Sequence, residues 1–169
     1  ERELTVTLPS ALTEPLLTAV PAAIHGGVND ALVAALALAV TRWRGDGGSR
    51  LLLEMEGHGR EAELLPGAID LSRTVGWFTT LYPVALDVPA GDLATVVKSV
   101  KEQLRAVPRA GLSYGALRHL AGHADLAVAP ALLFNYLGRF AAGAQVGEDR
   151  DPRMPLPRAL EVNAITVDT

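Results

Sequence analysis

An apolar run that ends in alternating glycines and charged residues constrains this chain more than any other stretch. Residues 51–55 read Leu-Leu-Leu-Glu-Met, and residues 56–61 continue as Glu-Gly-His-Gly-Arg-Glu. The apolar run predicts a buried strand, and the glycines predict a sharp turn at its end, because glycine adopts backbone conformations that other residues avoid. A carboxylate, an imidazole and a guanidinium therefore gather in a turn after a strand, where binding and catalytic residues are often placed.

Period-two alternation places Glu54 and Glu56 on one face of this expected strand, beside Leu52. Two like charges in close proximity and partial burial both raise the pKa of a carboxyl group, which suits one of them to proton transfer near neutral pH. The alternative stays open that Glu54 pairs with an arginine while Glu56 faces solvent, because perturbed carboxylates also occur in structural ion pairs.

The remaining patterns predict an α/β (α+β) sandwich, in which helices cover one face of a mixed sheet. We expect strands over residues 3–8, 50–56, 79–88, 131–138 and 158–167, and helices over residues 10–20, 29–44, 92–107 and 113–120. Asp92 is the expected N-cap of a helix with a clear apolar stripe, Asn29 that of the helix before it, and Pro83 places its strand at an edge or a bulge. Residues 61–69 are expected to be a loop with one helical turn, and residues 141–157, which are rich in Gly, Pro and Asp, a loop.

Composition excludes several kinds of site. The 169 residues are enough for one domain or a large piece of one, and 49% of them are apolar. A net charge of −4 with no block of Lys and Arg argues against a nucleic-acid partner. The absence of cysteine rules out disulfides and thiolate metal sites, and the four histidines are too scattered for a metal-ligand pattern. No signal segment or bilayer-length apolar stretch is present, so we expect a cytoplasmic protein without membrane contact.

Two polar residues outside the turn are further candidates. Asn135 lies inside the apolar run 131–138, where a buried amide without a partner costs about 1–3 kcal/mol. It therefore either ties a loop to the strand or points at a ligand. Arg73 could anchor a carboxylate, whether that of Glu56 or a ligand's, and the alternative is a solvated loop arginine.

Three segments together resemble a known family. Residues 56–61, residues 70–79 (Asp-Leu-Ser-Arg-Thr-Val-Gly-Trp-Phe-Thr) and residues 134–138 (Phe-Asn-Tyr-Leu-Gly) look like motifs of the epimerization domains of nonribosomal peptide synthetases, in the family's order. Residues 28–30, 111–115 and 160–164 fit the same pattern, so the resemblance covers nearly the whole chain. The related condensation domains share the fold but usually lack the first and third of these motifs.

The resemblance implies a fold like that of chloramphenicol acetyltransferase, in which two similar α/β halves form a V around a channel. The first half of such a domain carries a His-His-x-x-x-Asp-Gly motif, which this sequence does not contain. Residues 1–169 are therefore expected to form the C-terminal subdomain of an epimerization domain, with the N-terminal half outside the sequence. Alone, this half is expected to be inactive.

The implied reaction inverts the Cα of an aminoacyl or peptidyl thioester, from L to a mixture of L and D. The substrate hangs on the phosphopantetheine of a peptidyl carrier domain, so neither a free cofactor nor a metal is expected. The implied partners are the N-terminal half, that carrier domain and a downstream condensation domain. Glu56 is the implied acid/base of this half, facing the histidine of the other half.

The resemblance gives weaker roles to other residues. Asn135 and Tyr136 are expected to support the site or the thioester carbonyl, with a purely structural Asn135 as the alternative. Arg73 is expected to orient Glu56 or to meet the carrier arm, and His58 to be structural.

The rest of the motif residues are expected to be supporting groups. Arg60 and Glu61 should brace the turn as an ion pair, and Trp77 and Phe78 should fill the core or the channel floor. Two other functions stay open: a condensation-type acyltransferase that joins two carrier-bound substrates, and a non-catalytic half-domain that docks carrier proteins.

Overall fold

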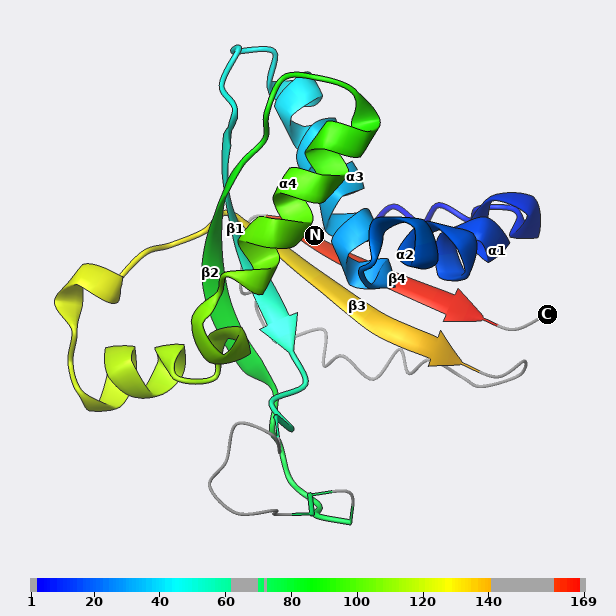
Figure 1. Ribbon diagram of the computed structural model, residues 1–169. Helices are drawn as coiled ribbons and strands as arrows, with labels where there is room; N and C mark the ends of the chain where they lie inside the picture. Colours follow the sequence, from blue (N-terminus) through cyan, green and yellow to red (C-terminus); the bar gives the residue numbers. More distant parts are fainter. Residues whose placement is uncertain (1–2, 62–69, 72, 141–159, 168–169) are drawn as a thin grey trace.

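The computed structural model of the chain describes residues 3–61, 70–71, 73–140 and 160–167 (Figure 1). In chain order its elements are α1 (Ser10–Leu17), α2 (Ala19–Ile24), α3 (Val28–Arg44), β1 (Arg50–Gly57), β2 (Thr80–Asp87), α4 (Leu93–Arg105), η2 (Pro108–Gly111), η3 (Ala116–Leu120), η4 (Ala124–Leu126), β3 (Leu132–Phe140) and β4 (Leu160–Val167). The loops predicted over 61–69 and 141–157 lie, apart from Glu61, outside the described residues.

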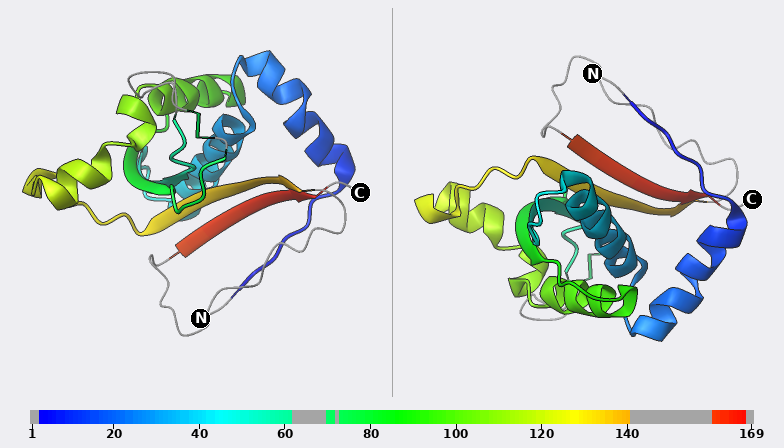
Figure 2. Two further views of the ribbon diagram at one scale, coloured as in Figure 1. Left: turned by 90° about the horizontal axis from the view of Figure 1, so that it is seen from below. Right: turned by 90° about the horizontal axis from the view of Figure 1, so that it is seen from above.

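The four strands form one mixed sheet in the order β2-β1-β3-β4. β1 pairs with β2 antiparallel and with β3 parallel, and β3 pairs with β4 parallel. Among the described strands β2 lies at an edge of the sheet, as Pro83 within it predicted. Helices α3 and α4 lie against one face of the sheet (Figures 1 and 2), so the predicted architecture of helices on a mixed sheet is confirmed.

The core lies between this face and the two helices. Alternate residues of β1 enter it, and their ladder partners on β2 and β3 enter it beside them. The buried members on the sheet are Leu51, Leu53, Met55, Val84, Leu86, Leu132 and Phe134, and those on the helices include Val33, Ala34, Ala37, Val96, Val97 and Val100. The period of two in the strands and the helical stripe of α4 thus meet in one cluster.

The opposite face of the sheet carries neither α3 nor α4 (Figure 2), and we call it the open face. Glu54 and Leu133, which are ladder partners on β1 and β3, are nevertheless only 4% and 2% exposed on it. Three leucines on the same face, Leu52 on β1, Leu81 on β2 and Leu137 on β3, are exposed by 39–41%. The open face is therefore partly apolar and partly accessible.

The predicted strand over residues 3–8 is wrong. These residues are extended, but they join no ladder within the described part of the chain, and Leu4 is 88% exposed. Alternation describes the shape of a strand, whereas a strand also needs a partner for its backbone hydrogen bonds.

The helix predicted over residues 10–20 is two helices, which meet at Thr18 with non-helical backbone angles. Pro21 explains the break, because its ring would collide with the carbonyl of Leu17 in a continuous helix and its nitrogen donates no hydrogen bond. The next helix begins at Val28 rather than after Asn29. Its N-terminus is closed by Asp30, whose carboxylate accepts the backbone N–H of Gly27 at 2.7 Å.

Between α4 and β3 the chain leaves the sheet as an arm that contains η2, η3 and η4 (Figure 1). Hydrogen bonds within the arm hold it: the Tyr114 hydroxyl donates to the carbonyl of Leu126 at 2.9 Å, and Arg118 donates to that hydroxyl at 2.9 Å and to the carbonyl of Val128 at 3.1 Å. The short helix predicted to begin after Ser113 and to end at Leu120 is confirmed: residues 114–120 are helical, and η3 is their π-helical part.

Candidate functional site

Glu56 is the penultimate residue of β1 and is half-buried. Its ladder partner is Leu81, and the next pair, Gly57 with Thr80, is the last of the ladder. Glu56 lies on the open face, since Met55 before it points into the helix-side core. The strand thus fixes the backbone of this carboxylate at the point where the sheet ends.

The turn after Glu56 closely approaches the segment that precedes β2. Gly59 has a φ of +65°, and a Cβ at this position would collide with the carbonyl oxygen of Phe78. Both its conformation and its surroundings therefore demand glycine, which confirms the sharp turn that the sequence predicted.

Arg60 links this turn to the chain that enters β2. Its guanidinium lies 4.3 Å from the centre of the Phe78 ring, and its Nη1 donates to the carbonyl of Leu71 at 2.8 Å. The guanidinium is within the range of an attractive cation–π contact. The turn is thus fastened to residues 71 and 78 by one side chain.

The His58 side chain contacts two other residues of the turn, Arg60 and Glu61. Its Nδ1 accepts the backbone N–H of Arg60 at 3.0 Å, and its Nε2 lies 3.3 Å from Oε1 of Glu61. The predicted ion pair between Arg60 and Glu61 is therefore wrong, because in the described structure Glu61 pairs with His58 and Arg60 reaches Leu71 and Phe78. The imidazole itself is 70% exposed.

Asn135 and Tyr136, the two candidates on β3, lie on opposite faces of the sheet. Register pairs Phe134 with Met55 in the core, so Asn135, one residue farther, lies on the open face with Glu56. Tyr136 lies on the helix side and packs against the core cluster. Asn135 is therefore on the same face as Glu56 on the neighbouring strand, whereas Tyr136 is on the other face.

Most of the candidates between residues 70 and 79 are exposed. Arg73 is exposed, and Trp77 and Val75 are 91% and 98% exposed, so Trp77 does not fill the core of this chain. Phe78 is half-buried beneath Arg60. The predicted role of Arg73 towards Glu56 or a carrier arm stays a prediction.

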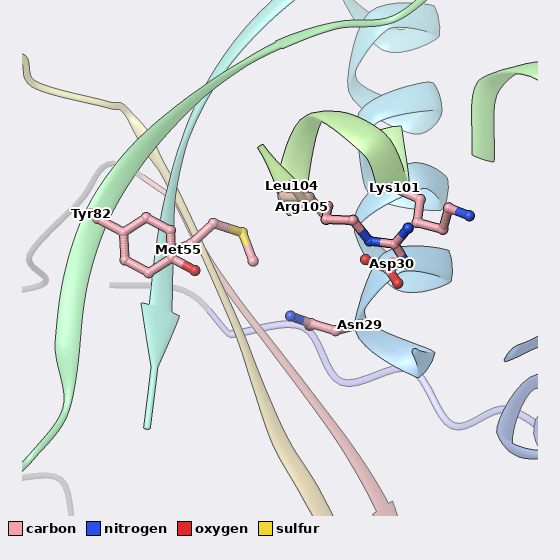
Figure 3. A pocket seen from close by; sticks show the side chains of 7 residues that line it. All are labelled: Asn29, Asp30, Met55, Tyr82, Lys101, Leu104 and Arg105. Atoms are coloured by element: carbon pink, nitrogen blue, oxygen red, sulfur yellow. The ribbon is translucent and has the colours of Figure 1, made fainter. Parts of the chain in front are cut away.

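A hollow of about 280 Å³ lies on the helix side, where β1 and β2 approach α3 and α4 (Figure 3). Its lining consists of Asn29, Asp30, Met55, Tyr82, Lys101, Leu104 and Arg105. Met55 and Glu56 point to opposite faces of β1, so this hollow and the carboxylate of Glu56 are on different sides of the sheet.

Tyr82 lines the hollow and also experiences the charge of Glu61 in the turn. Burial and, to a smaller extent, the negative charge of Glu61 raise the pKa of its phenol. Its ring packs against Gly111, which has a φ of +78° and where a Cβ would collide with that ring. Sequence reasoning missed Tyr82 because its surroundings come from three segments that are distant along the chain.

Metal ligation and membrane insertion find little support in the described residues. No group of three or more His, Cys, Asp or Glu side chains there could hold a metal ion. No single described helix is long and apolar enough to cross a membrane, although the bent pair of residues 10–24 and α3 passes by length and composition alone.

Comparison with known proteins identifies the family. The sequence profile of the Condensation domain matches residues 1–158. The chain belongs to the condensation-domain family. The match includes the turn, the helices and the strands β1, β2 and β3, and it ends before β4.

Its relatives are large synthetases. The chain is 51% identical over 139 residues to chondramide synthase cmdD of Chondromyces crocatus, which covers 81% of this chain and 4% of that protein. It is 39% identical over 150 residues to bacitracin synthase 3 of Bacillus licheniformis, covering 87% of this chain and 2% of that protein. The chain thus spans a small part of the relatives that it matches.

Among solved structures, the epimerization domain from the third module of tyrocidine synthetase B superposes with a TM-score of 0.82 at 34% identity, over 98% of this chain and 39% of that one. A structure of condensation domain-mediated chain release from the enacyloxin polyketide synthase gives a TM-score of 0.65 at 18% identity, over 95% of this chain and 33% of that one. The second likeness shows the fold alone.

Proposed function

We propose that this condensation-family chain is the C-terminal half of an epimerization domain of a nonribosomal peptide synthetase. The observation that carries the proposal is the position of Glu56: a half-buried carboxylate held at the end of β1, on the open face, with Asn135 on the adjacent strand. The 34% identity and the TM-score of 0.82 to an epimerization domain support it.

In this mechanism Glu56 handles the proton on one face of the substrate Cα. The Cα–H bond breaks, its electron pair passes into the thioester as an enolate, and the proton moves to a base; a proton then returns from the opposite face. A carboxylate can serve as the base or, once protonated, as the acid. The N-terminal half supplies the group on the other side.

Asn135 provides an amide on the same face as Glu56. Its NH₂ can donate hydrogen bonds to an oxygen on which negative charge develops, and such preorganised donors are a large contribution to catalysis. Tyr136, on the other face, supports β3 from the core instead of meeting the substrate.

The proposal includes the partners that this chemistry requires. A peptidyl carrier domain presents the substrate on its phosphopantetheine, which replaces any free cofactor. The N-terminal half completes the channel, and a downstream condensation domain receives the inverted residue. A cytoplasmic location belongs to the same proposal.

The test replaces Glu56 by Gln in the complete domain, meaning this chain together with its N-terminal half. With a loaded carrier in D₂O, the parent should incorporate deuterium at Cα. Glu56→Gln should reduce that rate by at least about 100-fold, the lower end of what a positioned acid or base contributes. Glu61→Gln, a carboxylate of the same turn that pairs with His58, should retain most of the rate.

A parent-like rate in Glu56→Gln would contradict the proposal. Condensation activity is the second candidate, because the profile match is to the condensation domain as a whole. With two loaded carriers, that function gives dipeptide without deuterium at Cα. Neither product from the intact parent protein would indicate a half-domain that docks carriers without catalysis.

A further inference from the structure

We propose that Arg60 and Phe78 form a clamp that positions Glu56 without touching substrate. The catalytic part of this inference rests on the function proposed above, whereas the mechanical part rests on the contacts alone. The clamp joins the turn, residues 57–61, to Leu71 and Phe78, which precede β2.

Three contacts beyond the last ladder pair hold these two segments together. The backbone of Gly59 lies against the carbonyl of Phe78, the Arg60 guanidinium lies 4.3 Å from the centre of the Phe78 ring, and its Nη1 donates to Leu71 at 2.8 Å. The Arg60 side chain makes two of them. It is half-buried, so solvent screens these contacts less than it does at an exposed site.

The geometry of the clamp suits arginine. A planar guanidinium can lie on an aromatic ring with its face while its edge donates a hydrogen bond to a carbonyl. A lysine ammonium is a compact, strongly hydrated charge that cannot make both contacts in the same way. His58 Nδ1 accepts a hydrogen bond from the backbone N–H of Arg60. This hydrogen bond fixes the backbone position from which the Arg60 side chain extends.

The clamp matters for Glu56 because that residue is followed by only one more ladder pair. Glu56 pairs with Leu81, and Gly57 with Thr80 ends the ladder. Ladder ends fray unless something beyond them ties the strands. A carboxylate that shifts by about 1 Å relative to a bound Cα can lose about 100-fold in rate. Arg60 and Phe78 provide that tie on the far side of Glu56.

The kinetic test uses Arg60→Gln, Arg60→Lys and Phe78→Leu in the complete domain with a loaded carrier in D₂O. Each variant should lower kcat for deuterium entry at Cα by about 10- to 100-fold, in line with a misplaced catalytic group. KM for the carrier should change less than about threefold, a range to be expected if substrate contacts remain. Arg60→Lys should fail to rescue the rate.

Arg44→Gln is the matched control. Its guanidinium donates to the carbonyl of Arg50 at 2.6 Å, so it ties the other end of the same strand. Loss of that contact should leave kcat near the parent value. Equal losses of kcat in Arg44→Gln and Arg60→Gln would mean that Arg60 acts only through general stability, and this result would overturn the proposal.

The second readout does not depend on activity. Backbone amide hydrogen exchange should become at least about tenfold faster over residues 57–61 in Arg60→Gln, while residues 51–54 of β1 keep parent-like protection. Unchanged exchange at the turn would overturn the clamp, and faster exchange with a parent-like kcat would overturn its catalytic role. If the parent domain incorporates no deuterium at Cα, the function proposed for Glu56 fails, and exchange alone decides whether the clamp exists.

Discussion

Lys101 shows how one charged residue holds elements that are far apart in the sequence. It is 8% exposed, and its Nζ donates to the carbonyl of Ile24 at the end of α2 at 2.9 Å. The same Nζ lies 3.0 Å from Oε1 of Glu102. A buried ammonium needs such partners, since burying an unpaired charge is very unfavourable. Lys101 therefore fastens the end of α2 to α4.

Replacement of Lys101 by Met should destabilise the chain by about 1–3 kcal/mol, because the Ile24 carbonyl loses its donor while the aliphatic stem is retained. The matched control is Lys98→Met, one turn earlier on the exposed side of α4, which should change stability by less than about 0.5 kcal/mol. Urea unfolding of the three proteins measures the difference. Equal stability of both variants would contradict this role of Lys101.

For single residues, the sequence predicted the sheet face on which a side chain lies better than it predicted the contacts that the side chain makes. Alternation correctly placed Glu54 and Glu56 on one face, and the glycines correctly predicted the turn. The partners of Arg60 could not be predicted, because they depend on how residues 71 and 78 return to the turn in space. Local propensity contains no information about such tertiary contacts.

Among the elements, α4 follows most directly from its sequence. The carboxylate of Asp92 accepts the backbone N–H of Thr95 at 2.8 Å, as expected of an N-cap. Hydrogen bonds from the side chain and backbone of Thr95 lower the pKa of this carboxyl below its ordinary value of 3.8. The ionised form thus binds the helix end more strongly than the protonated form does.

A lowered pKa in the folded state gives the stabilisation by Asp92 a defined pH dependence. The contribution is complete above the unfolded pKa of about 4 and is lost as the pH falls through the lower folded value. Asp92→Asn keeps a good cap that does not titrate. Relative to this variant, the parent should lose stability below about pH 4, measured by thermal unfolding from about pH 7 to about pH 2.5. Parallel stability curves for the two proteins would contradict the prediction.

Long patterned elements were predictable, and short or unpaired ones were not. The sequence predicted β1, β2, β3, β4 and α4 within a few residues, because burial of one face leaves a clear period in each. Residues 3–8 show the same period without a partner strand in the described part of the chain. The break between α1 and α2 was missed, although Pro21 carried the signal for it.

At the scale of the whole molecule, the open face exposes apolar side chains that the described part of the chain does not cover. Leu52, Leu81 and Leu137 are exposed there, and the chain covers 39% of the epimerization-domain chain that it resembles. If the N-terminal half completes the domain as proposed, these side chains become buried at the junction. The architecture of two halves was predicted from the family resemblance alone. The residue pattern of one half contains no information about the other half that would cover it.

Leu81 tests this arrangement, because it is the ladder partner of Glu56. In the complete domain, Leu81→Ser should cost about 1.5–3 kcal/mol of unfolding free energy, the range for a leucine that is fully buried. Leu93→Ser, which changes a 64% exposed leucine at the start of α4, should have a small effect. Denaturant unfolding of the complete domain distinguishes the two. Equally small effects would place Leu81 outside the junction.

Pro83 affects whether a further strand can pair with the outer edge of β2. The proline lies within β2, whose outer side has no neighbour among the described strands, and its ring nitrogen carries no proton. A strand from another molecule that approached this side would meet a gap in the row of donors, which discourages edge-to-edge aggregation and strand exchange. Pairing of copies through β2 is thus disfavoured by a single peptide nitrogen that has no proton to donate.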